Sequence, residues 1–157
     1  MSCMKPRFVL LTFAGALAIG ACSAGRPGCS DTSDATAVVE QFGRRLQMVS
    51  LQSPTAKEDL RQQYSPFVAP ALLDEWILAL PAAPGRMVSS PWPDSIEVTS
   101  VEVLTAGRFS VSGTIQEMTS WELTQGGVAG QVPITMTVEE VEGVCLITQY
   151  LEVQGGD

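Results

Sequence analysis

The amino-acid sequence predicts an α+β domain in which N-terminal helices pack on a curved antiparallel sheet of about four strands, a cone-like roll. Three observations lead to this fold class. Apolar residues recur at helical spacing up to about residue 80, and from residue 96 onward they alternate with polar residues at strand spacing. The predicted helices come first and the predicted strands follow as one block, which is typical of α+β proteins rather than of alternating βαβ folds.

The first 21 residues have the features of an export signal. Lys5 and Arg7 precede an apolar run over residues 8–20. This run has about the length of the apolar region of a signal peptide, and it is shorter than the roughly 20 residues that a membrane-spanning helix needs. We therefore interpret residues 1–21 as a leader that is removed on export.

The end of this leader, residues 19–22 with the sequence IGAC, resembles the lipobox of bacterial lipoproteins. The resemblance implies that Cys22 carries a diacylglyceryl group and anchors the protein on the extracytoplasmic side of the bacterial cell membrane. Residues 22–33 are mostly small and polar and would form a flexible tether, and residues 34–157 would form a single domain. The alternatives are an ordinary signal peptide with a chance cysteine, or a buried apolar segment.

The composition excludes several classes of function. The chain contains no histidine, so Ser-His-Asp catalysis, Cys-His catalysis and histidine-based zinc sites are excluded. The leader contains two basic residues and no acidic ones, so its removal changes the net charge from −8 to −10. Phosphate backbones repel such an acidic chain. We therefore expect no nucleic-acid partner, and we find no motif for a cofactor or metal.

The four cysteines leave two for the folded part of the chain. Cys3 lies in the leader and Cys22 would carry lipid, whereas Cys29 and Cys145 would face an oxidising compartment, where disulfides persist. A bridge between these two would close a loop of about 116 residues and contribute about 4–5 kcal/mol in the chain-entropy model. The alternative is a free Cys29 in the tether and a small, buried, apolar Cys145, and the sequence leaves both possibilities open.

The first predicted helix covers residues 35–49. Its apolar residues lie three or four positions apart and so form one stripe, which we expect to be buried. Ser33 or Asp34 is the predicted N-cap, because a short polar side chain can accept a hydrogen bond from a free amide of the first turn. The stripe consists of Ala35, Val38, Val39, Phe42, Leu46 and Val49.

Two shorter helices are predicted next. Thr55 and Glu58 have the spacing of a capping box and follow a Ser-Pro pair, which indicates a helix that extends to Tyr64. A second apolar stripe over residues 69–80 indicates a third helix, and the prolines that follow this stripe end it.

The first strand is predicted from the change of period near residue 96. Ile96 and Val98 alternate with polar residues, but Val101 and Val103 lie on the opposite phase. An extra residue in a strand produces such a phase change, so we expect a β-bulge near Ser100.

Three further strands are expected after this one. The second begins at Phe109 and is expected to run on through Met118 to Leu123. The third covers residues 132–138, and the last, over residues 144–153, is apolar on both faces at its start, which predicts a central or covered strand. Glycine-containing turns at residues 105–107, 126–127 and 142–143 separate the strands.

This layout resembles the nuclear transport factor 2-like superfamily of cystatin-like α+β rolls. The matching segments are the opening helix ATAVVEQFGRRLQMV, the strand pair IEVTSVEVL and FSVSGTIQEM, and the closing VEGVCLITQYLEV. The resemblance implies two or three helices folded against a strongly bent sheet that encloses a cone. Cys145 stands where the family often has tryptophan.

The resemblance also suggests where chemistry would occur. Isomerase- and dehydratase-like members of the superfamily use a base inside the cone, together with a tyrosine or a second acid. Glu117 lies on the same strand face as Ile115, so it enters the cone if that face is the inner wall and faces solvent if a bulge turns it outward. Tyr64 and Tyr150 are candidate pocket residues, and their alternative is a place in the core with a bonded hydroxyl.

Two tryptophans are candidates for a ligand pocket or binding surface. Trp92 lies between two prolines, and such a rigid loop can present an aromatic side chain to a partner. Its alternative role is packing across the mouth of the cone. Trp121 could likewise line a pocket or an exposed surface.

The sequence therefore favours a membrane-anchored, non-enzymatic module that binds an envelope protein or a small apolar ligand. This hypothesis predicts a cavity in the cone or an exposed apolar patch around Trp92 and Trp121. The alternative is a small-molecule enzyme of the isomerase or dehydratase type. It requires a buried carboxylate, such as that of Glu117, within hydrogen-bond reach of a tyrosine.

Overall fold

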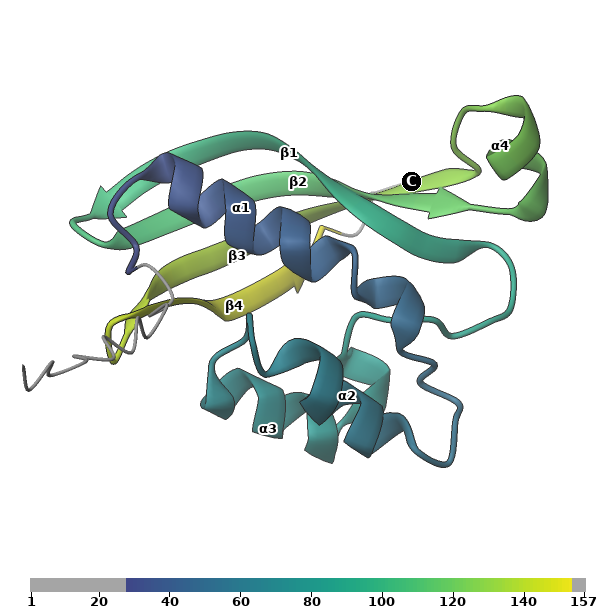
Figure 1. Ribbon diagram of the computed structural model, residues 1–157, viewed down its shortest axis with the longest axis horizontal. Helices are drawn as coiled ribbons and strands as arrows, with labels where there is room; N and C mark the ends of the chain where they lie inside the picture. Colours follow the sequence, from purple (N-terminus) through teal and green to yellow (C-terminus); the bar gives the residue numbers. More distant parts are fainter. Residues whose placement is uncertain (1–27, 154–157) are drawn as a thin grey trace, which may run out of the picture.

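The computed structural model describes residues 28–153, in which a layer of helices covers one face of a four-stranded antiparallel sheet (Figure 1). The helices are α1 (Thr32–Gly43), α2 (Ala56–Tyr64), α3 (Pro70–Leu78) and α4 (Ser120–Gln125), with 3₁₀ turns at Leu46–Met48 and Leu80–Ala82. The strands are β1 (Trp92–Thr105), β2 (Arg108–Met118), β3 (Gly130–Val141) and β4 (Val144–Glu152). They pair in chain order as a meander. The predicted α+β class, with its curved sheet of about four strands, is confirmed.

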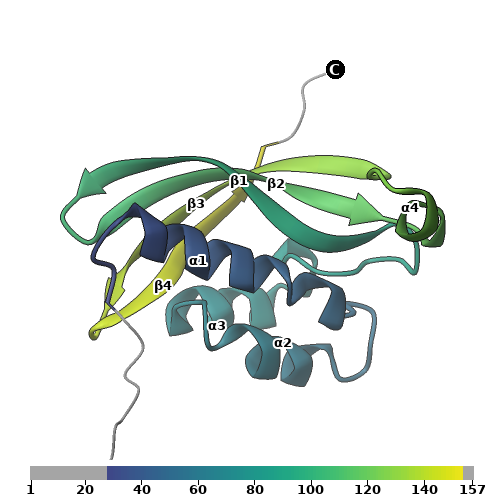
Figure 2. The ribbon, with the colours of Figure 1, turned by 45° about the horizontal axis from the view of Figure 1, so that its top comes forward.

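The predicted leader, the lipobox-like segment and Cys22 lie outside the described residues. Within residues 28–153, no helix is both long enough and apolar enough to cross a membrane. The helices α1, α2 and α3 lie on one side of the sheet, and α4 lies beyond its end (Figure 2).

Helix α1 begins earlier than predicted. Its N-cap is Asp31, rather than Ser33 or Asp34, and the Asp31 carboxylate accepts hydrogen bonds from the backbone amides of these two residues at 2.8 and 3.2 Å. The predicted apolar stripe is buried except for Val38, which is half-buried. The prediction of one helix to Val49 is wrong, because α1 ends at Gly43 and a 3₁₀ turn follows at Leu46–Met48. At Gly43 the helix approaches β1 so closely that an added Cβ would lie 2.6 Å from the backbone nitrogen of Ile96, which explains the glycine.

A disulfide joins Cys29 to Cys145, whose Cα atoms lie 4.7 Å apart. Both cysteines are buried. The bridge fixes the residues before α1 to the start of β4. The chain from Cys29 onward therefore belongs to the folded unit, although we had assigned residues 29–33 to a flexible tether.

The predicted capping box of α2 does not form. Thr55 does precede this helix, but its φ of −97° and ψ of 9° are not the extended conformation typical of an N-cap. Its hydroxyl donates to a carboxylate oxygen of Asp59 at 3.0 Å instead of accepting from a helix amide.

The prediction that the second strand continues to Leu123 is wrong, because β2 ends at Met118 and α4 begins at Ser120. Thr119 is the N-cap of α4 and accepts a hydrogen bond from the amide of Trp121 at 3.1 Å. The Glu122 carboxylate accepts from the amide of Thr119 at 3.0 Å and from its hydroxyl. Thr119 and Glu122 thus form a capping box, and this spacing was the sequence signal for the helix.

Bulges decide which residues of the edge strands face the helices. In β1 the pairing register shifts between Val98 and Ser100, which places the predicted bulge at Thr99. In β4 the extra residue is Thr148, so that Ile147 and Tyr150 both point toward the helices.

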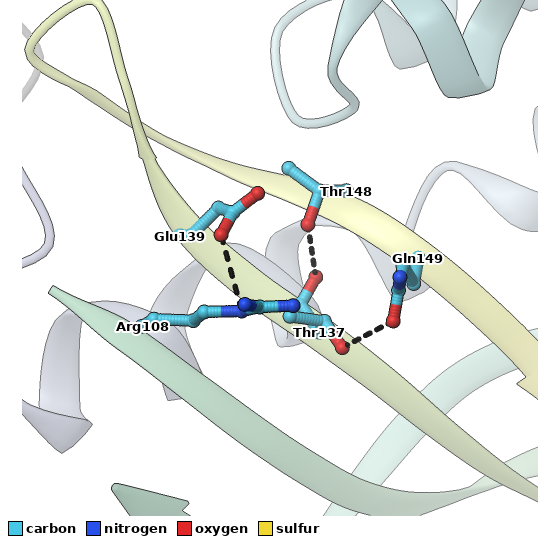
Figure 3. A network of polar contacts seen from close by, with 5 residues as sticks. All are labelled: Arg108, Thr137, Glu139, Thr148 and Gln149. Carbon is cyan, nitrogen blue, oxygen red and sulfur yellow. Dashed lines mark hydrogen bonds and ion pairs between the residues drawn. The ribbon is translucent and has the colours of Figure 1, made fainter. Parts of the chain in front are cut away.

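Hydrogen bonds support the bulge in β4 (Figure 3). The Thr148 hydroxyl donates to the backbone oxygen of Thr137 at 3.4 Å, and the Thr137 hydroxyl donates to the side-chain oxygen of Gln149 at 3.0 Å. Nearby, the Arg108 Nε and a Glu139 carboxylate oxygen lie 3.2 Å apart. Because both of these side chains are partly exposed, the ion pair contributes little, roughly 0–1 kcal/mol.

Strand β4 lies at an edge of the sheet but is covered, which agrees with its apolar sequence. Residues 67–69 run beside it. The amide of Ala69 donates to the backbone oxygen of Ile147 at 2.9 Å, and the amide of Ile147 donates to the backbone oxygen of Phe67 at 2.8 Å. This short pairing satisfies backbone groups that an open edge would expose.

Four aromatic side chains fill the centre of the space between helices and sheet, and we call them the aromatic plug. Phe42 comes from α1, Tyr64 from α2, Trp76 from α3 and Tyr150 from β4. The Phe42 and Tyr64 ring centroids are 4.9 Å apart, and those of Trp76 and Tyr150 are 5.7 Å apart, both in edge-to-face geometry. The roll is therefore packed with side chains at its centre.

We predict that replacing both Cys29 and Cys145 with serine lowers the free energy of unfolding by about 4 kcal/mol, because the bridge closes a loop of 116 residues in the unfolded chain. Denaturant unfolding of the two proteins measures the difference. Wild-type protein treated with a reductant is the matched control and should show a similar loss. Equal midpoints for all three samples would contradict the prediction.

Candidate binding site at the mouth of the roll

A cavity of about 190 Å³ opens at the end of the roll nearest α4, and we call it the mouth cavity. Strand residues form its floor, and the loop between α3 and β1 forms its rim. The lining residues are Gly85, Met87, Val88, Pro91, Pro93, Ile115, Glu117, Val132 and Glu152.

Glu117 reaches the mouth cavity through the regular alternation of β2. Ile115 pairs with Val132 and Glu117 pairs with Gly130, so both β2 residues face the helix side of the sheet. The Glu117 side chain is half-buried and lies over Gly130, where an added Cβ would collide with its carboxylate. Of the two predicted orientations, the structure therefore has the inward one.

The bulge that we considered at Glu117 lies instead across from it, in β1. The pairing register there shifts between Pro93 and Ser95, which makes Asp94 the extra residue. As a result Pro93 and Ile96, three positions apart, both face inward, and Pro93 joins the lining of the mouth cavity.

Glu152 is a second carboxylate in this cavity, and sequence reasoning missed it. It lies two residues after Tyr150 on the same face of β4. The Tyr150 hydroxyl donates to a Glu152 carboxylate oxygen at 2.7 Å. Tyr150 therefore connects the aromatic plug to the mouth cavity, and the alternation of β4 after its bulge was the only sequence signal for Glu152.

Tyr64 has a structural role rather than a place in the cavity. It is fully buried in the aromatic plug, and its hydroxyl donates to the backbone oxygen of Pro84 at 2.7 Å. Pro84 directly precedes Gly85, the first residue of the cavity rim. The hydrogen bond of Tyr64 thus holds the rim loop against the core.

Neither candidate tryptophan lines the mouth cavity. Trp92 is half-buried and pairs with Met118, so it lies on the face of the sheet opposite Pro93 and Glu117. Its neighbours Pro91 and Pro93 do contribute to the lining. Trp121 is 69% exposed on α4, so it belongs to a surface rather than to a pocket.

The mouth cavity contains two carboxylates, and the rest of its lining is mostly apolar. Among residues 28–153, no group of three or more His, Cys, Asp or Glu side chains is placed to hold a metal ion. The volume of about 190 Å³ is below the roughly 300–1,000 Å³ of typical small-molecule sites. The cavity therefore suits one narrow chemical group, such as a side chain, better than a whole metabolite.

Burial keeps both tyrosine hydroxyls protonated. Desolvation raises the pKa of the Tyr64 phenol well above its usual value of 10. The pKa of the Tyr150 phenol is also raised well above that value, first by burial and then by its hydrogen bond to the Glu152 carboxylate. Tyr150 can therefore act as a hydrogen-bond donor at neutral pH, and it is not a base.

Comparisons with known proteins add little to this picture. No protein-family model matches the sequence, and no characterised protein matches it. Among solved structures, the chain is similar to a protein named Rd1NTF2_05_I64F_A80G_T94P_D101K_L106W, at 15% sequence identity and a TM-score of 0.40, over 78% of this chain and 100% of that one. The helices and meander themselves have the arrangement that the resemblance to nuclear transport factor 2-like rolls predicts.

We predict that the native protein resists phenol ionisation and loses stability in alkali. Both tyrosines of the chain have raised pKa values in the folded state. Their contribution to stability is fully present below about pH 10, the pKa of an unfolded tyrosine, and is lost as the pH rises further. Ultraviolet titration should detect tyrosinate near pH 10 in denaturant but not in the folded protein. A normal tyrosinate transition in the folded protein would contradict the burial of both hydroxyls.

Proposed function

We propose that this protein is a lipid-anchored, extracytoplasmic module that binds a partner protein through the end of its sheet that carries α4. The anchor rests on the lipobox-like sequence before Cys22. The observation that carries the binding role is a set of exposed apolar side chains at the end of the fold opposite Cys29.

The topology separates the two ends of the molecule. In the meander, the β1–β2 and β3–β4 turns lie at one end and the β2–β3 connection, which contains α4, lies at the other (Figures 1 and 2). Cys29 is at the first end, beside the turn at Gly107. Strand β2 has 11 residues, which corresponds to about 35 Å between the ends at roughly 3.3 Å per residue.

The exposed apolar residues lie on residues 119–129, which we call the α4 tip. Trp121 is 69% exposed, Leu123 63% and Val128 43%. Single exposed apolar residues are common, but three on one short projecting segment are typical of an interaction surface. The helical layer does not cover this segment (Figure 2).

The charge distribution indicates what kind of surface binds there. Residues 87–153 contain nine acidic side chains and a single basic one, Arg108, which lies at the opposite end and is paired with Glu139. Glu122 follows Trp121 on the α4 tip, and Glu117 lies two residues before the tip begins. A basic protein surface with an apolar recess is therefore the complementary partner. An anionic bilayer would be repelled, and the proposed anchor directs the tip away from it.

The disulfide limits how far the proposed anchor lets the domain move. Cys29 is bonded to β4, so only residues 23–28 separate the domain from Cys22. Even when fully extended, six residues reach no more than about 22 Å, which is well below the length of the sheet. The disulfide end would therefore stay near the membrane, and the α4 tip would face partners in the envelope.

The enzyme alternative has weaker support. The pair formed by Tyr150 and Glu152 has the expected hydrogen bond, but Glu152 is exposed and Glu117 is only half-buried. Neither carboxylate is enclosed by apolar side chains as the general acid of such an enzyme is.

The anchor is tested by a Cys22→Ala substitution. We expect wild-type protein to fractionate with membranes and the variant to be released, because the acyl chains would be lost. Cys3→Ala is the control and should remain with membranes. If the Cys22→Ala protein stays membrane-bound, the lipid anchor is refuted.

The docking role is tested by a photo-crosslinking residue at position 123 or, as a control, at position 78, because Leu78 is 86% exposed on α3. We expect one discrete crosslinked envelope protein from position 123 and none from position 78. Reversing charge with Glu117→Lys and Glu122→Lys should reduce that product at least tenfold, whereas Glu58→Lys on α2 should not. Equal products from both positions, or no effect of charge reversal, would overturn the proposal.

A further inference from the structure

We propose that the mouth cavity receives a lysine or arginine side chain of the partner protein, with its charged group against Glu117 and Glu152 and its alkyl stem against the apolar lining. This inference rests on the proposed docking function and names the chemical group that is recognised. Glu117 comes from β2 and Glu152 from β4, so the two carboxylates reach one cavity from different parts of the sheet.

Among the described residues, neither carboxylate forms an ion pair with a cation. The one ion pair found in residues 28–153, between Arg108 and Glu139, is at the other end of the sheet. Arg86 belongs to the rim loop, but it lines a separate groove beside Ser50 and does not line the mouth cavity. Glu152 accepts one hydrogen bond from Tyr150, and a carboxylate can accept several more. The cavity therefore has unused acceptors and an excess of negative charge.

The remaining lining selects a cation that carries an apolar stem. Ile115 and Val132 form an apolar floor, and Met87 and Val88 on the rim are 47% and 58% exposed. Lysine and arginine pack their methylene groups on such surfaces while their charged ends form hydrogen bonds. A metal ion or an ammonium ion would leave these apolar walls uncovered.

The mouth cavity and the α4 tip belong to one surface. Glu117 lies two residues before Thr119, the N-cap of α4, and the amide of Ala129 donates to the backbone oxygen of Glu117 at 2.7 Å. A partner that covers Trp121 therefore lies close enough to place one basic side chain in the cavity. This geometry connects apolar docking and charge recognition in a single contact.

Three small probes test the cavity without the partner, namely n-butylamine, n-butanol and butyrate. They share an alkyl stem and differ in charge. We expect n-butylamine to shift the NMR methyl signals of Ile115 and Val132 in a saturable manner, with an affinity at least tenfold higher than that of n-butanol, and butyrate not to bind. The double variant Glu117→Gln, Glu152→Gln should lose this preference. Glu102→Gln is the matched control, because Glu102 is an exposed carboxylate on β1 outside the mouth cavity, and this variant should keep the preference for n-butylamine.

Each contrary outcome overturns the inference. Equal binding of n-butylamine and n-butanol would show an apolar cavity without charge recognition, and the absence of saturable shifts with any probe would show no binding cavity. The inference and the proposed function fail separately. Crosslinking at position 123 without amine binding would refute only the cation site. Amine binding without specific crosslinking would refute the docking role and leave a site for small amines.

Discussion

The aromatic plug is the contact on which the rest of the structure depends. It takes one ring from each of α1, α2, α3 and β4, so the three helices and the sheet meet in a single set of contacts. Loss of a buried ring of this size typically costs about 3–5 kcal/mol, a large fraction of the stability of a domain this small. The plug also has a functional consequence. Because it fills the centre of the roll, the cavity that contains Glu117 and Glu152 lies beyond Tyr150, at the mouth.

Two bulges connect this core to the candidate site. With strict alternation, Ile147 and Tyr150 would face opposite sides of β4, and either the core or the mouth would lose a side chain. The extra residue at Thr148 brings both to the helix side and carries Glu152 to the cavity. The register shift at Asp94 does the same for Pro93 and Ile96 in β1. Local irregularities of the sheet therefore build the site, in agreement with the frequent occurrence of bulges near functional regions.

The parts of the fold that follow from local periodicity were predictable. The stripe of α1 and the phase change in β1 could be read from residue spacing. The inward orientation of Glu117 could not, because it depends on whether a bulge lies in β2 or across from it in β1. The capping boxes show the limit of this approach. Thr119 has the extended backbone that an N-cap needs, with φ −123° and ψ 175°, whereas Thr55 does not. The capping box therefore forms at α4 and not at α2, although both segments have the same spacing of side chains. The spacing of side chains does not determine how the chain enters a helix. The rim of the cavity was equally hidden, because it depends on the long-range hydrogen bond between Tyr64 and Pro84.

The disulfide and the charge distribution both distinguish the two ends of the sheet. Cys29–Cys145 joins the N-terminal segment to the turn end of the sheet, so an anchor at Cys22 would fix the orientation of the whole domain as well as its location. Residues 87–153 carry nine of the 17 acidic residues, and their single cation, Arg108, is paired with Glu139 toward the disulfide end of the sheet. The opposite end is therefore both uncompensated in charge and apolar at its tip. Electrostatic attraction acts over about a Debye length, 8–10 Å at physiological salt, so it would draw a basic partner to this end first. The apolar contacts of Trp121 and Leu123 act only at close range, and they would determine whether the partner stays.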